Sequence, residues 1–387
     1  MISFEHFKFS DDLRKSIERL GYQSPTKIQE ESIPLILAGR DMLGESETGS
    51  GKTLAFGSGV IENTARGKGL QALILTPTRE LAEQVKVSLC KLAYHKQLKI
   101  TAIYGGVSFG PQFRSLKSAD IVVATPGRFK DHLQRGTVNT SNVSILVLDE
   151  ADRMLDMGFI DDIEMIINSC PNRKQTLFFS ATIPPQIEKL SKRYLKRPIK
   201  VSTRKHVDSK KLKQGYFDVP RSLKFSLLLH LLRDTSSKLA MVFCNTRRTT
   251  DVVIKHLKIY KVDAVALHGG FPQNKRTEAI ENFKEGKIHV LVCTDVAARG
   301  IHVDNISHIY NYDIPSNPID YVHRIGRTAR AGEEGQVINL LSEEDHDNFS
   351  RILCEYRFSI NKLKKPYVER VVFCSHRTSS SKKPRMR

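Results

Sequence analysis

Three groups of residues in this sequence combine the types and the spacing that phosphate chemistry requires. The first is SETGSGKT, from Ser46 to Thr53, which follows a short apolar stretch and precedes a stretch of helical pattern. Gly49 and Gly51 let the backbone curl so that its N–H groups face a phosphate at the positive end of the next helix. Lys52 can neutralise the β- and γ-phosphates, and the Thr53 hydroxyl can bind Mg²⁺. Because the strict pattern begins with glycine and this chain has Ser46 there, a flexible Gly-Ser turn is the alternative.

The second group is the pair of acids Asp149 and Glu150, which comes directly after the apolar run ILVL. A carboxylate at the end of a strand can hold Mg²⁺ opposite a phosphate loop, and its neighbour can orient and deprotonate water. An acidic strand end by itself often only caps the following helix. The phosphate-loop pattern about a hundred residues upstream favours a nucleotide site.

The third group is the run YVHRIGRTAR, with Arg324, Arg327 and Arg330 on what we expect to be one helix. Arg327 and Arg330 are three residues apart, so both should project from one face. Arginines buried behind a sheet would be costly, and we therefore expect them to face a cleft and bind an anion. A solvated basic helix face is the alternative, although the surrounding Ile, Gly, Thr and Ala suit it poorly. An arginine brought to phosphates that another domain holds can stabilise phosphoryl transfer.

Short apolar runs that alternate with amphipathic stretches should position these residues. Continuous apolar strands separated by helices predict parallel sheets covered on both faces, with functional residues in the loops beyond the carboxyl ends of the strands. The pattern breaks once, in the polar, basic stretch 202–214, which predicts a linker between two doubly wound domains. The expected strands lie within 72–77, 99–105, 120–126, 145–150, 176–182, 239–246, 263–270, 288–295, 308–315 and 335–341.

The formal charge of +19 indicates a polyanionic partner. Residues 204–213 carry +4 of it and residues 365–387 carry +6, and a solvated, disordered stretch is the alternative interpretation of the latter. The six cysteines form no C-x-x-C pair, as expected of reduced thiols in a cytosolic protein. With no signal-peptide pattern and no apolar run long enough for a bilayer, we expect a soluble, cytoplasmic protein.

The chain resembles the DEAD-box RNA helicases over nearly its whole length. Asp149-Glu150-Ala151-Asp152 is the motif that names the family. The other motifs stand in family order: GYQSPTKIQ (21–29), SETGSGKT (46–53), PTREL (77–81), GG (105–106), TPGR (125–128), SAT (180–182), VFCNT (242–246), QNKR (273–276), TDVAARG (294–300) and HRIGRTAR (323–330). So many short motifs in one order make the resemblance highly specific.

The resemblance implies an α/β protein with two tandem RecA-like domains, each a doubly wound parallel sheet, joined by a flexible linker. We expect an ATP-binding domain over 1–203, the linker over 204–213, a second helicase domain over 214–364 and a disordered basic tail over 365–387. The implied activity is that of an RNA-dependent ATPase that locally unwinds or remodels short RNA duplexes or RNA–protein complexes. The two domains would close on ATP and RNA together, with Mg²⁺ as the metal.

The resemblance also assigns roles at the nucleotide. Gln29 would read the adenine edge and Phe4 would stack on adenine, although packing of Phe4 against neighbouring aromatic residues is an alternative. Asp149 would hold the metal with Thr53, and Glu150 would be the catalytic base. The expected catalytic residues are Lys52, Asp149, Glu150, Arg327 and Arg330. The expected nucleotide-binding residues are Phe4, Lys27, Gln29, Ser46, Glu47, Thr48, Gly49, Ser50, Gly51, Lys52, Thr53, Asp295, Gly300, His323, Arg327 and Arg330.

Two further sets of residues follow from the resemblance. The residues expected to tie hydrolysis to domain closure are Asp152, Ser180 and Thr182. The RNA-binding residues are small polar groups, arginines and exposed backbone, which suit phosphates and 2′-hydroxyls better than base edges and imply sequence-independent binding. They are Pro77, Thr78, Arg79, Gly106, Thr125, Gly127, Arg128, Thr246, Gln273, Arg276 and Thr294.

The sequence departs from the family pattern in two places. Ser46 stands where a small apolar residue or glycine is usual, and serine, being small, should be tolerated. His302, in ARGIH, stands where the family commonly has Asp. Histidine is bulkier and neutral or cationic, so we expect weaker closure and a higher nucleotide KM than in a His302→Asp variant; equal KM values would reject this.

Two other functions remain open from the sequence: an ATP-dependent RNA clamp or scaffold with little turnover, and a DNA-directed helicase of the wider superfamily. The expected partners are single-stranded RNA or short duplexes, without a membrane, and the protein should be monomeric. The basic tail is expected to hold RNA in a loose, salt-sensitive grip or to bind protein partners. In a eukaryote it would also suit a nuclear address.

Overall fold

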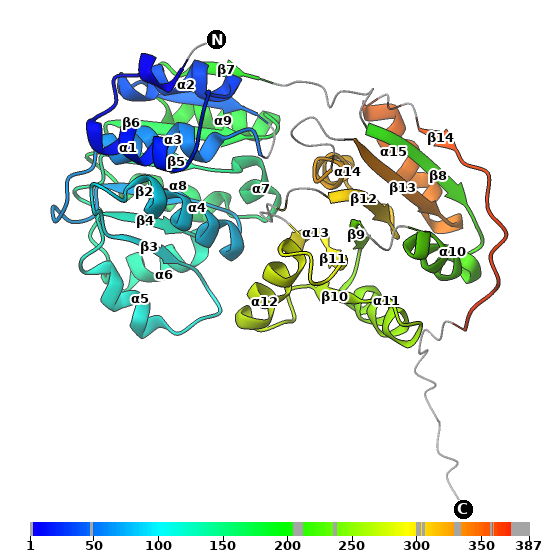
Figure 1. Ribbon diagram of the computed structural model, residues 1–387. Coiled ribbons are helices and arrows are strands. Elements are labelled where there is room, and N and C mark those ends of the chain that lie inside the picture. Colours follow the sequence, from blue (N-terminus) through cyan, green and yellow to red (C-terminus); the bar gives the residue numbers. More distant parts are fainter. Residues whose placement is uncertain are drawn as a thin grey trace, which may run out of the picture. The chain divides into compact units, whose positions relative to one another are not determined.

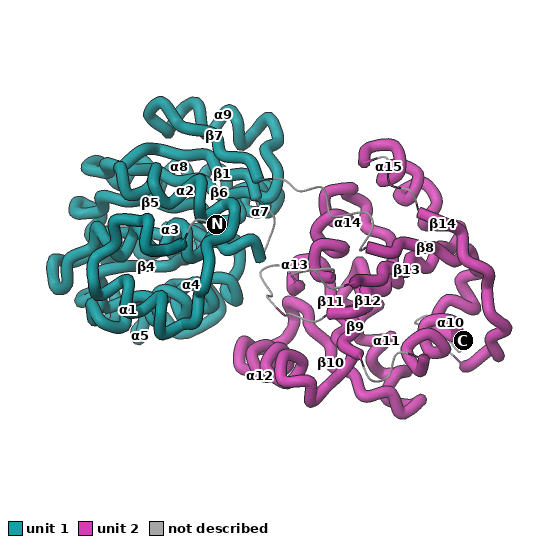
Figure 2. The backbone as a smooth tube through the Cα atoms, turned by 45° about the horizontal axis from the view of Figure 1, so that its top comes forward, with its two compact units in different colours: residues 1–206, 299–302 teal, residues 207–298, 303–387 magenta. Residues whose placement is uncertain are grey.

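The computed structural model of this chain divides into two compact units (Figure 2). The first consists of residues 1–206 with 299–302, and the second of residues 207–298 with 303–387. The structure describes residues 3–46, 49–203, 212–234, 238–298, 303, 306–328, 334–356, 358 and 360–372. Among these residues, no helix is long and apolar enough to span a lipid bilayer.

The first unit is built on a seven-stranded parallel sheet in the order β3-β4-β2-β5-β6-β1-β7 (Figure 1). Its strands are β1 (Met42–Glu45), β2 (Ala72–Leu75), β3 (Ile100–Ile103), β4 (Ile121–Ala124), β5 (Ile145–Leu148), β6 (Gln175–Ser180) and β7 (Ile199–Ser202). The central strands are buried along their whole length, as continuous apolar runs predict.

Helices cover both faces of this sheet. The 3₁₀ helix η1 (Phe4–His6) and the helices α1 (Asp11–Arg19), α2 (Lys27–Leu37), α3 (Lys52–Glu62) and α4 (Arg79–Leu92) share one core. The other core contains α5 (Phe109–Leu116), α6 (Pro126–Gln134), α7 (Ala151–Asp156), α8 (Ile160–Asn168) and α9 (Pro185–Tyr194). Phe178 and Phe179, neighbours on β6, are buried in opposite cores because successive side chains of a strand alternate.

The second unit repeats the topology of the first. Its sheet has the order β10-β11-β9-β12-β13-β8-β14, so each strand holds the same place, by chain order, as its counterpart in the first unit. The strands are β8 (Leu212–Asp218), β9 (Leu239–Cys244), β10 (Ala264–Leu267), β11 (Val290–Thr294), β12 (Ile306–Asn311), β13 (Gly335–Leu341) and β14 (Asn361–Lys362). The helices are α10 (Arg221–Asp234), α11 (Arg247–Ile259), α12 (Gln273–Lys284), α13 (Asp295–Ala298), α14 (Pro318–Ile325), the 3₁₀ helix η2 (Glu343–Asp345) and α15 (His346–Tyr356). The expected fold class is therefore confirmed.

The expected linker includes two residues too many. Leu212 and Lys213 already belong to β8, where they pair with Gly335 and Gln336 of β13. This pairing with a distant strand is what makes a polar, basic segment extended. Residues 204–211 of the expected linker lie outside the described residues.

The expectation of disorder from residue 365 onward is wrong for residues 365–372. Val368 and Val371 pack against the core beside α10 and α11. The backbone N–H of Val371 donates to Ser226 Oγ at 3.1 Å, and the Tyr260 hydroxyl donates to the carbonyl of Val372 at 3.2 Å. Figure 1 shows this segment, drawn in red, running from β14 along the unit towards α11. Spaced apolar residues thus fix a segment whose charge suggested a free tail; residues 373–387 lie outside the described residues.

Candidate functional site

The phosphate-loop residues occupy the turn between β1 and α3. Gly49 and Gly51 have φ angles of 85° and 95°, which glycine adopts readily and other residues rarely do. The buried Lys52 ammonium donates to the carbonyl of Ser46 at 2.9 Å. The hydroxyl groups of Ser46 and Ser50 are hydrogen-bonded to each other, so serine at position 46 fits the loop. The expected residues Glu47 and Thr48 lie outside the described residues.

Gln29 is bound to the phosphate loop. Its Nε2 donates to the carbonyl of Gly51 at 3.0 Å, and its Oε1 accepts from the N–H of Thr26 at 2.9 Å. Thr26 Oγ1 in turn donates to the carbonyl of Ser50 at 2.7 Å. A side chain at position 51 would collide with Gln29, which is a second reason for glycine there. Adenine recognition by Gln29 stays a prediction, and any such contact would be transmitted directly to the loop.

The two other expected residues near the nucleotide lie outside this loop. Phe4 is buried, with its ring edge-on to Phe7 at 6.0 Å between centroids. This is the geometry that the packing interpretation expects, and stacking of Phe4 on adenine stays a prediction. Lys27, the first residue of α2, is exposed and lies 3.8 Å from Glu31 one turn later.

The acidic pair lies at the end of β5, one strand from β6 and two from β1. Asp149 and Glu150 are both buried, and Glu150 has a left-handed backbone with φ 53°. Such a conformation is strained for a side chain other than glycine and is concentrated at functional sites. Burial raises the pKa of Asp149 to about 7, against the opposing charge of Lys52. A buried carboxylate with this pKa fits a bound divalent cation, and carboxylate and hydroxyl oxygens are ligands that Mg²⁺ prefers.

The three expected coupling residues are in direct contact. Asp152 Oδ2 accepts both the backbone N–H and the hydroxyl of Thr182, each at 2.9 Å. The N–H of Asp152 donates to Ser180 Oγ at 3.1 Å. The loop after β6 is therefore tied to the helix that begins immediately after Glu150. A displacement of either segment must strain these bonds.

The expected RNA residues of the first unit follow β2, β3 and β4, which are adjacent in the sheet. The Thr78 hydroxyl accepts the N–H of Leu81 and caps α4, and Thr125 is the N-cap of α6, which contains Gly127. The Arg79 guanidinium lies against Gly106, which has φ 78°, so a side chain at that position would have to displace the guanidinium and adopt a left-handed backbone.

Arg128 reaches the same edge of the sheet, where its Nη1 donates to the carbonyl of Val107 at 3.1 Å. Because parallel strands end at one edge, the RNA set therefore lies beside the nucleotide set that follows β1, β5 and β6.

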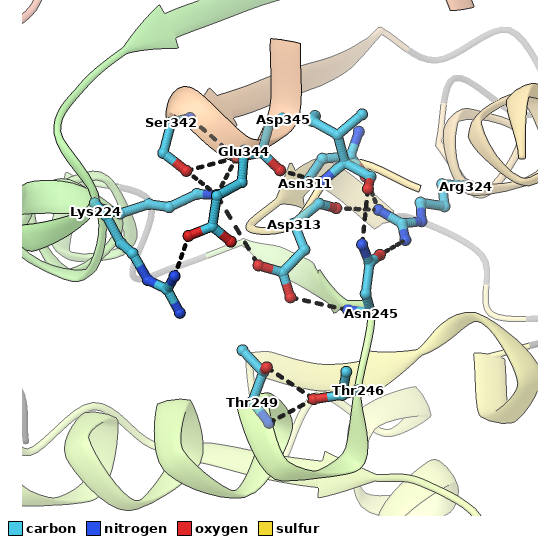
Figure 3. Close-up of polar contacts among 12 residues, drawn as sticks. Lys224, Asn245, Thr246, Thr249, Asn311, Asp313, Arg324, Ser342, Glu344 and Asp345 are labelled. Carbon is cyan, nitrogen blue, oxygen red and sulfur yellow. Dashed lines mark hydrogen bonds and ion pairs between the residues drawn. The ribbon is translucent and has the colours of Figure 1, made fainter. Parts of the chain in front are cut away.

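In the second unit, the expectation that Arg324 faces a cleft is wrong. Its side chain is 1% exposed and makes a bidentate ion pair with Asp295, with Nε at 2.6 Å and Nη2 at 2.7 Å from the two carboxylate oxygens. Other acceptors are Asn311 Oδ1 at 3.0 Å, the carbonyl of Asp313 at 2.6 Å and Asn245 Oδ1 at 2.9 Å (Figure 3). Burial is tolerable because the charge is paired and all five donors have acceptors. Asp295, expected at the nucleotide, is the partner of this arginine.

The expectation of a single helix for all three arginines is also wrong. Helix α14 ends at Ile325, because Gly326 stops it, and Arg327 follows the helix as a buried residue. The ring nitrogens of His323 have no hydrogen-bond partner among the described residues, as expected of a side chain that awaits a ligand. Arg330, Gly300 and the departure His302 lie outside the described residues.

The expected RNA residues of the second unit follow the three adjacent strands β9, β10 and β11. The hydroxyl of Thr246 accepts the N–H of Thr249 at 3.0 Å and caps α11. Gln273 and Arg276 lie on α12, and Thr294 is the last residue of β11. These positions match those of the RNA set in the first unit, strand for strand.

A polar network beside α14 was not predicted from the sequence (Figure 3). Asp313 Oδ2 accepts the N–H of Asn245 at 2.9 Å, and the Lys224 ammonium lies 2.7 Å from Asp345 Oδ2 and 3.9 Å from Asp313 Oδ1. The only signal in the sequence was the position of Asn245 inside VFCNT. The partners are too far apart in the chain to be paired by inspection.

Both halves of the chain match helicase families. Residues 26–190 match the DEAD/DEAH box helicase family, and residues 223–332 match the helicase conserved C-terminal domain. The chain is 41% identical over 371 residues to the DEAD-box ATP-dependent RNA helicase CshA of Bacillus subtilis (strain 168), covering 95% of this chain and 75% of that protein. It is 44% identical over 348 residues to the ATP-dependent RNA helicase CshA of Listeria monocytogenes, covering 89% and 67%. A solved structure of S. cerevisiae Dbp5 bound to RNA and ADP BeF3 is similar with a TM-score of 0.85 and 29% identity, covering 93% of this chain and 95% of that one.

Proposed function

Because this chain belongs to the DEAD-box family of ATP-dependent RNA helicases, we propose that it is an RNA-dependent ATPase that locally unwinds or remodels short RNA duplexes or RNA–protein complexes. The observation that carries the proposal is the arrangement at the ends of β1, β5 and β6. There a phosphate loop, an acidic pair and a hydrogen-bonded coupling cluster lie at neighbouring strand ends of one sheet.

In the proposed site, Lys52 neutralises the β- and γ-phosphates, and the N–H groups at the start of α3 face them. Thr53 and Asp149 would hold Mg²⁺, which supplies charge neutralisation between the phosphates when it is bound. Glu150 orients and deprotonates the attacking water. The left-handed backbone of Glu150 supports this role, because it directs the residue away from the path of an ordinary helix start.

Domain closure is the second part of the proposal. ATP and single-stranded RNA together would draw the two units shut, so that His323, Arg327 and Arg330 reach the γ-phosphate and stabilise the charge of its transfer. The ring of His323, whose nitrogens have no hydrogen-bond partner among the described residues, supports this assignment. The contacts of Asp152 with Ser180 and Thr182 would pass the state of the acidic pair to the loop after β6.

We propose that the protein binds RNA without regard to the RNA sequence. The candidate groups in both units are capping threonines, glycines and arginines at strand ends, which suit phosphates and 2′-hydroxyls. A bent strand held in this way is incompatible with a duplex, so a short helix would be opened locally. We further propose that the protein works as a cytoplasmic monomer and that residues 373–387 add a salt-sensitive RNA grip or bind protein partners.

The variant Glu150→Gln tests the catalytic assignment. It should lower RNA-stimulated phosphate release by at least about a hundredfold, because it removes the base but keeps the shape of the side chain. Binding of ATP and of single-stranded RNA should persist. The control variant is Glu164→Gln, which removes a carboxylate of the same unit that pairs with Arg193 on the surface. Robust turnover by Glu150→Gln would eliminate Glu150 as the base.

Two measurements on the wild-type protein distinguish the other functions. An ATP-dependent RNA clamp with little turnover predicts tight RNA binding and negligible phosphate release in the presence of RNA. A DNA-directed helicase predicts that single-stranded DNA competes as well as RNA of the same sequence. We expect RNA-stimulated turnover and a clear preference for RNA.

A further inference from the structure

We propose that Asn245 is a positioning residue that couples the RNA contact at the start of α11 to the nucleotide-facing helix α14. The inference rests on the proposed function, because it assumes that the second unit contributes groups to both ligands. It concerns residues of that unit alone. The two elements are far apart in the chain, and Asn245 is bonded to both.

The side-chain amide of Asn245 is used at both ends. Its Oδ1 accepts from Nη2 of Arg324 at 2.9 Å, and its Nδ2 donates to the carbonyl of Ile314 at 2.8 Å (Figure 3). A guanidinium can only donate and a carbonyl can only accept, so the orientation of the amide is fixed by its partners. Aspartate lacks the donor and an apolar residue lacks both groups. Among side chains of this size, only asparagine makes the two contacts.

The backbone of Asn245 fixes the start of α11. Its N–H donates to Asp313 Oδ2 at 2.9 Å. The next residue, Thr246, caps α11 by accepting the N–H of Thr249 at 3.0 Å, and its carbonyl accepts the N–H of Thr250 at 3.0 Å. Thr246 is also a proposed RNA contact. A shift of the α11 start on RNA binding is therefore transmitted to Asn245 without an intervening flexible segment.

The side chain of Asn245 also contacts helix α14 and the segment that precedes it. Arg324 lies on this helix, beside His323, and Ile314 lies in the segment that leads from β12 into the helix. The same arginine binds Asp295, which follows the proposed RNA residue Thr294 of β11. Asn245 thus contacts the helix through Arg324 and the segment before it through Ile314. Any rotation of α14 towards a phosphate must either carry Asn245 along or break these bonds.

Stabilising Arg324 requires only an acceptor at this position, whereas asparagine also donates to the carbonyl of Ile314. The charge of Arg324 is already compensated by the bidentate contact with Asp295, and Asn245 is an exposed residue at the end of β9. An exposed position imposes no apolar or volume requirement of its own. The position requires a side chain with one acceptor for Arg324 and one donor for the carbonyl of Ile314. We infer that these two contacts keep the start of α11 and helix α14 in a fixed arrangement.

The experiment measures thermodynamic coupling in the full-length protein. The Kd of a fluorescent single-stranded RNA is determined with and without a saturating nonhydrolysable ATP analogue, and the ratio of the two values is the coupling factor. We expect wild type to show a factor within the usual range of about 5 to 150. Asn245→Leu, which has the same shape but neither polar group, should lower this factor by about tenfold or to unity. Without nucleotide, its RNA Kd should change by less than about threefold.

Two further variants make the test specific. Asn245→Asp keeps the acceptor for Arg324 but presents a second acceptor to the Ile314 carbonyl, so it should also lose coupling. Asn339→Leu is the control: Asn339 is a buried amide that binds Asn311 at 2.8 Å and Tyr321 at 3.2 Å, and it lies on β13, outside the turn that leads into α11. It should keep the wild-type coupling factor even where it lowers stability.

The possible results separate the inference from the proposed function. Wild-type coupling that persists in Asn245→Leu, or full coupling in Asn245→Asp, overturns the inference and leaves the proposed function intact. Equal loss in Asn339→Leu overturns it as well, because general loosening of the unit would then be the cause. A wild-type coupling factor of one contradicts the proposed closure itself.

Discussion

Replacing Asp295 with asparagine tests how the second unit holds a buried charge. The Arg324 side chain is 1% exposed, and two of its five donors bind the Asp295 carboxylate at 2.6 and 2.7 Å. Asparagine fills nearly the same volume as aspartate but offers one acceptor oxygen where aspartate offers two. Its amide N–H groups would face the second guanidinium N–H, and two donors cannot bond to each other. The other acceptors of Arg324 are untouched by the change, so the effect of the ion pair is isolated.

The expected cost follows from this geometry. Loss of one hydrogen bond to a charged group costs about 1.5–3 kcal/mol. Removal of one partner of a buried ion pair costs about 3–5 kcal/mol, because the remaining charge is left without compensation. The two ranges meet near 3 kcal/mol. We therefore expect the free energy of unfolding of the second unit to fall by about this amount.

Amide hydrogen exchange of the full-length protein resolves the effect by unit. A loss of about 3 kcal/mol should lower the protection of β9, β11 and β12 by about a hundredfold, since 1.4 kcal/mol corresponds to a factor of ten. Strands β2 and β4 of the first unit should keep their protection and serve as the internal reference. The method avoids the assumption that a chain with two units unfolds in one step.

The control variant for this measurement is Glu334→Gln. Glu334 pairs with Lys213 at 2.9 Å, but both side chains are about 70% exposed. Surface pairs of this kind contribute little, so no measurable change in protection is expected. A fall of less than about threefold for Asp295→Asn would refute the reasoning, because the charge of Arg324 would then be stabilised without Asp295.

Three further predictions concern other parts of the chain. Thr182→Val removes the hydrogen bond from the hydroxyl to Asp152 at 2.9 Å and keeps the shape of the side chain. The rate of strand separation should fall by about tenfold, while RNA-stimulated phosphate release changes by less than about twofold. Equal losses of the two activities would refute a coupling role. Burial lowers the pKa of His132 to about 4, so its stabilising contribution is complete above pH 6.5 and is lost as the pH falls towards 4. Between pH 7 and pH 4.5, the free energy of unfolding of wild type, measured by chemical denaturation, should fall by about 1–2 kcal/mol more than that of His132→Phe. This value is discounted because the solvent-exposed Arg135 lies nearby. Equal falls in the two proteins would exclude His132 as the titrating group. Deletion of residues 373–387 should raise the RNA KM and flatten its salt dependence, whereas unchanged values would indicate an inert tail.

The sequence predicted the parts of the fold in which local pattern and burial agree. The continuous apolar runs became β2, β4, β5 and β11, which are buried along their length, and β9, which is buried except at its first residue. Strands β7 and β8 were missed because exposed residues interrupt their buried ones. Their extended form depends on pairing with β1 and β13, and no local pattern contains that information.

The site was predictable where one motif carries both the chemistry and its position. The turn from Ser46 to Thr53 and the acidic pair at the end of β5 lie where their spacing indicated. The burial of Arg324 was not predictable, because the cost of burying a charge depends on partners that the local sequence does not show. Asp295 and Asn311 compensate that cost, and both are distant in the chain. Hydrogen-bond networks of this kind require the fold before they can be inferred.

The duplicated topology gives both units the same kind of strand-end groups, which we propose as RNA contacts. In each unit a threonine after the second strand caps the following helix: Thr78 accepts the N–H of Leu81 at 3.3 Å, and Thr246 accepts that of Thr249 at 3.0 Å. In each unit, too, an arginine next to this cap approaches a glycine that follows the third strand: Arg79 lies against Gly105 and Gly106, and Arg247 lies against Gly269. Two copies of one edge offer a backbone-binding surface twice, which suits a strand that contacts both units.

Among the described residues the second unit lacks the phosphate-loop features of the first, and the difference lies in the connection after the first strand. In the first unit the turn that contains Gly49 and Gly51 leads directly to Lys52, the first residue of α3. In the second unit β8 leads through Val219 and Pro220 into α10, without a glycine turn. The lysine on that helix, Lys224, is buried and already paired with Asp345 at 2.7 Å. Because Lys224 is neutralised inside the unit, it is not available to a phosphate as Lys52 is proposed to be. This supports the proposal that the second unit acts on ATP through other groups, such as His323 and Arg327.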